Sequence, residues 1–260
     1  MERRSALIGD GFRGWDMALS AWLLSASVLM SVLVQEERTP EEQHIVLFDR
    51  DRARQESTGS TRIFAHQLCL KYGCSIRHIY GAVPGMAIEG GRITNLLRAS
   101  GVSSVHADAE VRFEADSARL VGAPPNAPLA YIGPGLDAET VPIEREVDYL
   151  RSKAASGDLM TQATLLVAAY AERSPNSRFW SMRVIDEKGS GVLSDVLAAL
   201  DFLLRYRYSL GAVYMPLRMQ GGDTAPMCRF VDAALQRGLL VLSSMDATCP
   251  LEPFGNMLGR

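Results

Sequence analysis

The sequence is poor in the residues on which most metal and imidazole chemistry depends. Among 260 residues there are 4 histidines and 4 cysteines, and the last histidine is His106. Residues 107–260 therefore contain no imidazole that could act as a general base. The cysteines lack the paired Cys-x-x-Cys spacing of zinc sites, and three disulfide pairings stay open among Cys69, Cys74, Cys228 and Cys249. We expect no metal site.

An excess of charge of one sign is also absent. The chain has 27 basic and 30 acidic side chains, a formal net charge of −3, and 47% hydrophobic residues. This composition is typical of a globular protein, and it lacks the concentrated basic surface that nucleic acid requires. No cofactor is expected either, because Gly189-Ser190-Gly191 is a lone G-x-G that favours a tight turn over a phosphate-binding loop.

The N-terminus has the pattern of a segment that enters the secretory pathway. Basic residues precede position 14, and residues 18–34 form an apolar run without charge. The pattern predicts a signal peptide or signal anchor over 1–34, with a buried core helix as the alternative. The protein would then be secreted or membrane-anchored, touching a membrane only through this segment, in an oxidising compartment. Residues 35–43 are polar and predict a tether.

Residues 44–113 predict a compact unit with the element order β-α-β-β-α-β. A helix should begin after Ser60 and end at Gly73, and a second helix should cover 92–99. Strands are expected at 45–48, 74–80, 85–90 and 105–111. This order is that of a split ferredoxin-like α+β sandwich.

Residues 114–128 contain three prolines and no apolar period, which indicates a linker. Strands and helices alternate after it and predict a parallel α/β sheet within 129–260. The expected strands are 129–132, 179–186, 211–215 and 239–244, and the expected helices are 161–171, 193–206 and 226–236.

Three stretches carry a resemblance to a known family. GAVPGMAIEGGRITNLLRASGVSSVHADAEV (81–111) resembles the last part of a subtilase propeptide. MRVIDEKGSGVLSDVLAALDFL (182–203) and FVDAALQRGLLVLSSMD (230–246) resemble subtilisin-like strand–helix units. Within the subtilases, MPL at 215–217 and DATC at 246–249 look nearest the proteinase K type, and particularly the LDL-receptor-binding type of proprotein convertase. The resemblance implies a ferredoxin-like propeptide domain followed by a truncated subtilisin-like parallel α/β domain.

The same resemblance implies that the catalytic positions are lost. Gly133 stands where the family has its orienting Asp, Leu159 stands at the catalytic His, and Asp246 stands at the oxyanion-hole Asn. Asp137 lies four residues beyond the first position and is expected to point elsewhere. No G-T-S-x-A segment precedes Arg260, and Pro216 with Met219 is expected to obstruct the substrate groove.

Other residues with possible chemistry have plainer interpretations. His44, His66, His78 and His106 show no ligand spacing and are interpreted as surface or structural residues. Asp186 and Asp195 are interpreted as turn and cap residues with no third group to tune them. Arg205, Tyr206, Arg207 and Tyr208 are interpreted as a solvated helix end.

Two functional hypotheses follow. The first is a catalytically inactive subtilase-like protein that acts by binding a protease or a receptor and that could also self-associate. The alternative is a divergent serine endopeptidase of the same family. The first hypothesis predicts no self-cleavage near 114–116, because self-cleavage requires an intact triad.

Overall fold

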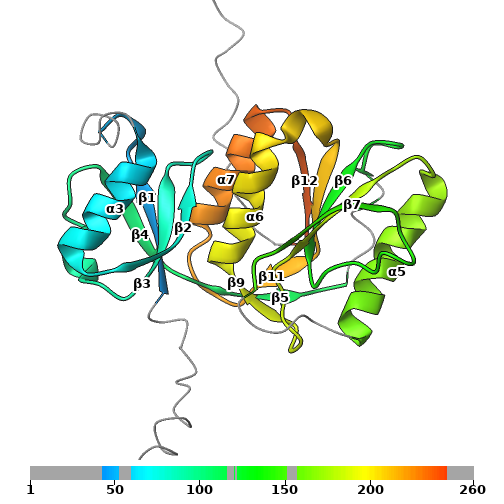
Figure 1. Cartoon of the computed structure of the whole chain (residues 1–260), viewed down its shortest axis with the longest axis horizontal. Helices are drawn as coiled ribbons and strands as arrows, with labels where there is room; N and C mark the ends of the chain where they lie inside the picture. Colours follow the sequence, from blue (N-terminus) through cyan, green and yellow to red (C-terminus); the bar gives the residue numbers. More distant parts are fainter. Residues whose placement is uncertain (1–42, 53–59, 116–119, 121, 151–156, 245–260) are drawn as a thin grey trace, which may run out of the picture. The chain divides into compact units, whose positions relative to one another are not determined.

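We describe the protein from a computed structural model, which covers residues 43–52, 60–115, 120, 122–150 and 157–244 (Figure 1). All of these residues belong to one compact unit. The predicted signal segment, most of the tether and Asp246 lie outside the described residues. Among the helices of the described ranges, none is long and apolar enough to cross a bilayer.

The N-terminal part is an antiparallel sheet with two helices on one face, which we call the sandwich. The sheet order is β2-β3-β1-β4, and the element order is the predicted ferredoxin-like one. The elements are β1 (Gln43–Phe48), α3 (Thr61–Tyr72), β2 (Ser75–Tyr80), β3 (Gly85–Glu89), α4 (Ile93–Leu96) and β4 (Val102–Ala107). Gln43 was assigned to the tether but is the first residue of β1.

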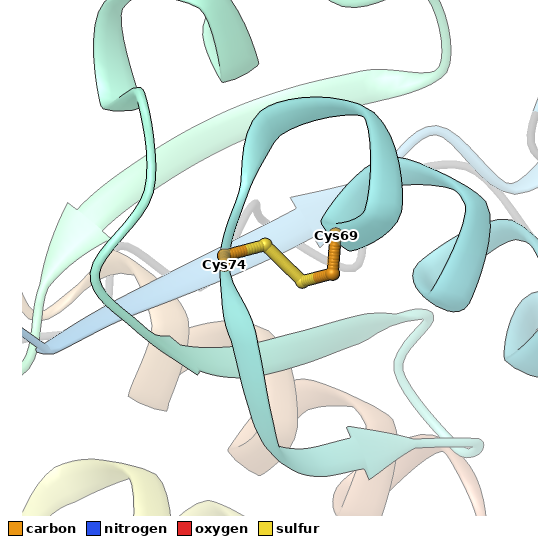
Figure 2. Close-up of a disulfide and its surroundings, with 2 residues drawn as sticks. All are labelled: Cys69 and Cys74. Carbon is orange, nitrogen blue, oxygen red and sulfur yellow. A yellow bond between two sulfur atoms is a disulfide. The ribbon is translucent and has the colours of Figure 1, made fainter.

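Helix α3 begins and ends at the predicted residues. The Ser60 hydroxyl accepts a hydrogen bond from the Ile63 amide, and Gly73 has the left-handed φ of 73° that ends the helix. Cys69 and Cys74 form a disulfide directly across this turn, with their Cα atoms 4.6 Å apart (Figure 2). Of the three pairings left open by the sequence, the structure therefore has the one that joins Cys69 to Cys74.

The C-terminal part is the predicted parallel sheet, with strand order β12-β10-β6-β8-β7. Its strands are β6 (Leu129–Gly133), β7 (Ile143–Asp148), β8 (Phe179–Arg183), β10 (Ala212–Met215) and β12 (Leu240–Ser243). Its helices are α5 (Asp158–Arg173), α6 (Leu193–Arg205), the short 3-10 helix η3 (Arg207–Ser209) and α7 (Ala225–Gln236). Strand β7 was not predicted, because four of the six residues of IEREVD are charged and only Ile143 and Val147 are apolar, too few to show an alternation.

The strand predicted at 105–111 is two strands that belong to different sheets. Strand β4 completes the sandwich and ends at Ala107, while β5 (Glu110–Phe113) lies between β9 (Ser190–Val192) and β11 (Leu217–Met219). The apolar alternation runs through both strands, so it cannot reveal where the chain leaves one sheet for another. Strands β9 and β11 are three residues each and were not predicted.

Helices α6 and α7 form the layer between the two larger sheets (Figure 1). One continuous core joins side chains of β1 and β3 in the sandwich to α6, α7 and one face of the parallel sheet. Helix α5 covers the opposite face of the parallel sheet, and α3 covers the outer face of the sandwich. Leu120, within the predicted linker, is 2% exposed and packs in the α5 core.

Candidate functional site

The carboxyl end of β6 carries no acid. Its last residue, Gly133, is buried, and a Cβ added there would lie 2.7 Å from Cζ of Tyr131. Residues 131 and 133 share one face of the strand, so the tyrosine ring fills the space that a side chain at 133 would need. The Tyr131 hydroxyl has no partner among the described residues, and burial raises its pKa well above the ordinary value. The packing around position 133 therefore leaves room for glycine and for no larger residue.

The acids near this strand end are engaged elsewhere. The Asp137 carboxylate accepts hydrogen bonds from the Thr140 hydroxyl at 2.7 Å and the Glu139 amide at 3.1 Å, and the first of these lowers the pKa of Asp137. At the end of β7, Asp148 forms an ion pair with Arg183. Partial burial acts to raise the pKa of Asp148, but the hydrogen bond from Arg183 leaves it lowered. Neither carboxylate is placed to orient a base.

Leu159 lies in the first turn of α5 and is half-buried. Its Cδ1 atom would lie 3.6 Å from a Cβ added at Gly189, so the leucine lies beside the turn that precedes β9. An aliphatic side chain cannot accept a proton. The structure thus places Gly133 at a strand end and Leu159 at a helix start, and neither contributes a titratable group.

Strand β5 lies between β9 and β11 in a short antiparallel sheet, and we call the place that it occupies the groove. In β5, Val111 lies opposite Gly191 on one side and Met219 on the other. The Phe113 amide donates to the Gly189 carbonyl at 3.1 Å. A stretch of chain that precedes the parallel sheet therefore occupies this groove with regular antiparallel pairing.

The expectation that Pro216 and Met219 obstruct such pairing is wrong. The Pro216 carbonyl accepts a hydrogen bond from the Glu114 amide at 2.8 Å, and Leu217 lies opposite Phe113. A proline lacks an amide hydrogen but keeps its acceptor, and here only the acceptor faces the neighbouring strand. The place between β9 and β11 is thus paired by β5, an extended segment of this same chain.

No protein-family model matches the sequence, and no curated protein matches it. Among solved structures, the chain is similar to fervidolysin from Fervidobacterium pennivorans, described as a keratinolytic enzyme related to subtilisin, with a TM-score of 0.55. The fold is subtilisin-like. Identity is 12%, and the similarity covers 81% of this chain but only 40% of fervidolysin. PH1313 from Pyrococcus horikoshii Ot3 is 12% identical over 78% of this chain and 80% of that one, but its TM-score of 0.21 carries no argument.

In this subtilisin-like arrangement, two buried aspartates of α6 hold the sandwich in place. Asp195, with its side chain 2% exposed, pairs with Arg77 Nη2 at 2.5 Å and with His78 Nε2 at 2.6 Å. Asp201 accepts the backbone amides of Gly81 and Ala82 at 2.7 and 2.6 Å. Together they tie β2 and the turn after it to the helix.

The interpretation of Asp195 as a cap residue without tuning partners is therefore wrong, whereas Asp186 does stabilise a turn. Asp186 Oδ1 accepts the amides of Lys188 at 2.9 Å and Ser190 at 3.0 Å. Gly189 in that turn has a φ of 83°, as expected for a structural G-x-G.

A third buried acid, Asp108, lies at the start of α6. It is 4% exposed, and its Oδ1 accepts the amide of Ser194 at 2.9 Å, in place of a cap from the helix's own preceding residue. Its Oδ2 has no partner among the described residues. Burial raises the pKa of Asp108 to about 6, although the hydrogen bonds from Ser194 act in the opposite direction.

His106 joins β4 to the loop before α7. Its Nδ1 lies 2.7 Å from Asp223 and its Nε2 lies 2.8 Å from the Ser104 hydroxyl. The order Ser–His–Asp matches a triad, but Ser104 lies within a regular strand. Oxyanion holes form where amides converge, at helix N-termini and tight turns. The three residues form a structural link, and among the described residues no cluster of His, Cys, Asp or Glu could hold a metal ion.

Sequence reasoning missed Asp108 and Asp201, although a signal existed for Asp201. The helix sequence LSDVLAALDFLLR places two acids in an otherwise apolar segment. A carboxylate in a helix that is buried all round must find donors outside the helix. Asp108 gave no such signal, because its neighbours alternate as in a half-exposed strand.

Proposed function

We propose that this chain is a catalytically inactive subtilase-like protein that acts by binding a partner protein, a protease or a receptor. The observation that carries the proposal is the packing at Gly133. The ring of Tyr131 fills the position from which an acid would orient the catalytic base. Leu159 supports it, because the position of the base is aliphatic.

The occupied groove supports a binding role over turnover. Strand β5 pairs with both β9 and β11, so a substrate peptide could enter only after β5 leaves. Enzymes need a vacant groove and a reacting group beside it, and here the described residues offer neither. A partner protease would bind to another surface of the sandwich or of the subtilisin-like layer.

We also propose that the protein enters the secretory pathway. A disulfide joins Cys69 to Cys74, and such bonds persist in oxidising compartments. A fusion of residues 1–43 to a glycosylation reporter should enter the endoplasmic reticulum; a reporter that stays unglycosylated in the cytosol would contradict the placement.

The decisive experiment treats the purified full chain with a fluorophosphonate probe and a panel of fluorogenic peptides, with subtilisin as positive control. We expect no labelled serine, no turnover and one uncut species by N-terminal sequencing across 114–116. Labelling at any serine, with turnover that the probe blocks, would instead favour the serine endopeptidase that the subtilisin-like fold also permits.

Self-association belongs to the same proposal. In the described part of the chain, β7 is an outer strand of the parallel sheet with a neighbouring strand on one side only, and an outer strand can pair with a strand of another copy. Sedimentation velocity should detect dimers or larger species at micromolar concentration. A single monomeric species over that range would remove self-association from the proposal.

A further inference from the structure

An arginine lies among three aromatic rings between the parallel sheet and α6. The Arg145 guanidinium carbon is 4.5 Å from the ring centre of Trp180, 4.8 Å from that of Tyr206 and 5.8 Å from that of Phe202. The rings also contact one another, with Trp180 and Phe202 centred 5.5 and 4.9 Å from Tyr206. Cation–π attraction therefore holds the guanidinium from more than one side.

A bulge in β7 aims Arg145 at this place. The pairing with β8 shifts between Ile143 and Arg145, so that Glu144 is the extra residue. Ile143 packs in the core on the α5 face, whereas Val147 packs in the core on the α6 face. Without the shift these two residues would share a face, so the bulge turns Arg145 and Val147 together toward α6.

The Arg145 guanidinium has donors that no acid of the described residues takes. No carboxylate of the described residues lies within ion-pair distance of Arg145. The indole Nε1 of Trp180 also has no acceptor among them, but it is buried, so Trp180 contributes its ring face to the cluster and no donor to a partner. A guanidinium stacked by its faces keeps its N–H groups in the ring-parallel plane, where they fit a carboxylate in two parallel hydrogen bonds.

The surface continues along the chain past Tyr206. Arg207 stacks on Tyr208 with its guanidinium carbon 4.1 Å from the ring centre, and Tyr208 is 87% exposed. Capping the negative end of α6 explains an arginine here, but it does not require an exposed tyrosine beside it. Tryptophan, tyrosine and arginine are the residues that dominate binding energy at protein interfaces.

We propose that the arginine–aromatic cluster, defined as Arg145, Trp180, Tyr206, Arg207 and Tyr208, docks a carboxylate-rich segment of a partner protein. The proposal deepens the binding function proposed above and rests on it. Charge complementarity selects this occupant, because Arg145 has no ion pair among the described residues. Arg207 donates to the Leu204 carbonyl and the Tyr208 hydroxyl but likewise has no acid partner among them. The exposed side chains of Glu144 and Glu146 flank Arg145, so the segment must place its carboxylates at the guanidinium groups and away from these two acids.

The test measures fluorescence anisotropy of a labelled twelve-residue peptide of Asp, Glu and Gly with the full chain at low salt. A peptide with Asn and Gln in place of the acids is the matched ligand control. We expect saturable binding of the acidic peptide only, weakened at least tenfold in Arg145→Gln and in Arg207→Gln. Arg62→Gln, at an exposed position of α3, is the matched protein control and should bind as the parent does.

Arg145→Lys separates shape from charge. Lysine keeps the positive charge but loses the planar fork, so binding should weaken nearly as much as in Arg145→Gln. Should either change at Arg145 unfold the protein, Arg207→Gln and Tyr208→Ala lie at the exposed end of the cluster and carry the same expectation.

Three outcomes would overturn the proposal: equal binding of the neutral peptide, unchanged binding in the Arg145 and Arg207 variants, or binding of heparin fragments without binding of the acidic peptide. These results are independent of the serine-probe experiment. If the chain binds the acidic peptide and also turns over substrate, the docking proposal for the cluster stands and the proposal of an inactive protease is refuted.

Discussion

Replacing Asp108 by asparagine should stabilise the protein at neutral pH and change little in acid. The carboxyl group is buried at the start of α6, one oxygen lacks a partner, and burial raises its pKa from 3.8 to about 6. Asparagine can still accept the Ser194 amide hydrogen through its side-chain oxygen. The substitution therefore removes a buried charge and keeps the hydrogen bond to the helix.

The expected magnitude follows from the raised pKa. Below pH 3.8 the group is protonated in the folded and the unfolded protein, so its ionisation does not affect stability. Between pH 3.8 and 6 the unfolded chain loses the proton first, and the free energy of unfolding falls as pH rises. Above pH 6 the loss is constant at about 3 kcal/mol. Asp108→Asn should thus stabilise by about 3 kcal/mol at pH 7.5 and by less than about 1 kcal/mol at pH 4.

Urea unfolding followed by tryptophan fluorescence at several pH values measures this difference. Asp195→Asn is the matched control, because it also removes a buried α6-bound carboxylate but breaks the ion pairs to Arg77 and His78. It should destabilise by about 3–5 kcal/mol at pH 7.5. The reasoning on Asp108 would be refuted by a stabilisation that does not depend on pH, or by a loss of stability like that of the control.

Two further changes test other parts of the structure. Gly133→Ala should destabilise by about 1–3 kcal/mol, because its Cβ would overlap the Tyr131 ring; thermal unfolding measures this, and an unchanged midpoint would show that the ring has room to move. Replacing both Cys69 and Cys74 by alanine should lower the free energy of unfolding by about 2 kcal/mol, because the disulfide closes a short loop between residues 5 positions apart. A much larger loss in the double variant would mean that the bridge acts beyond its own turn.

The sequence predicted the helices and strands well where a single apolar periodicity determines the type of element. Helix α3 follows from the four-residue spacing of its apolar residues and from Ser60 and Gly73 at its ends. The buried strands of the parallel sheet follow from their continuous apolar runs. The ferredoxin-like order and the α/β alternation were confirmed for the same reason.

The short strands could not be predicted from the sequence. Strands β9 and β11 have three residues each, and β5 continues the alternation of β4, so no local pattern separates them from loops or from each other. They exist because they pair with one another across long distances in the chain. The misjudged role of Pro216 has the same origin, because only the pairing partner reveals that its carbonyl, and not its missing amide hydrogen, is used.

For the candidate site, the sequence predicted which positions to inspect but not what surrounds them. Gly133 and Leu159 could be named from the resemblance, but the tyrosine ring over Gly133 depends on the side-chain direction within β6. The partners of Asp195 lie more than 110 residues earlier in the chain, with separations of 118 and 117 residues for Arg77 and His78. Tertiary contacts of this kind leave no trace in local spacing.

The central position of β5 has a consequence for the order of folding. The sandwich is built from contacts within one short stretch of chain, whereas the β9-β5-β11 sheet closes loops such as the 80 residues between Glu110 and Ser190. Contacts that close long loops form slowly, because the loop-closure entropy is lost before the contacts repay it. The sandwich also leaves the ribosome first. It should therefore be in place, with Asp108 and β5 presented, when α6 and its neighbouring strands emerge, so that the nascent α/β layer condenses on a surface that has already formed.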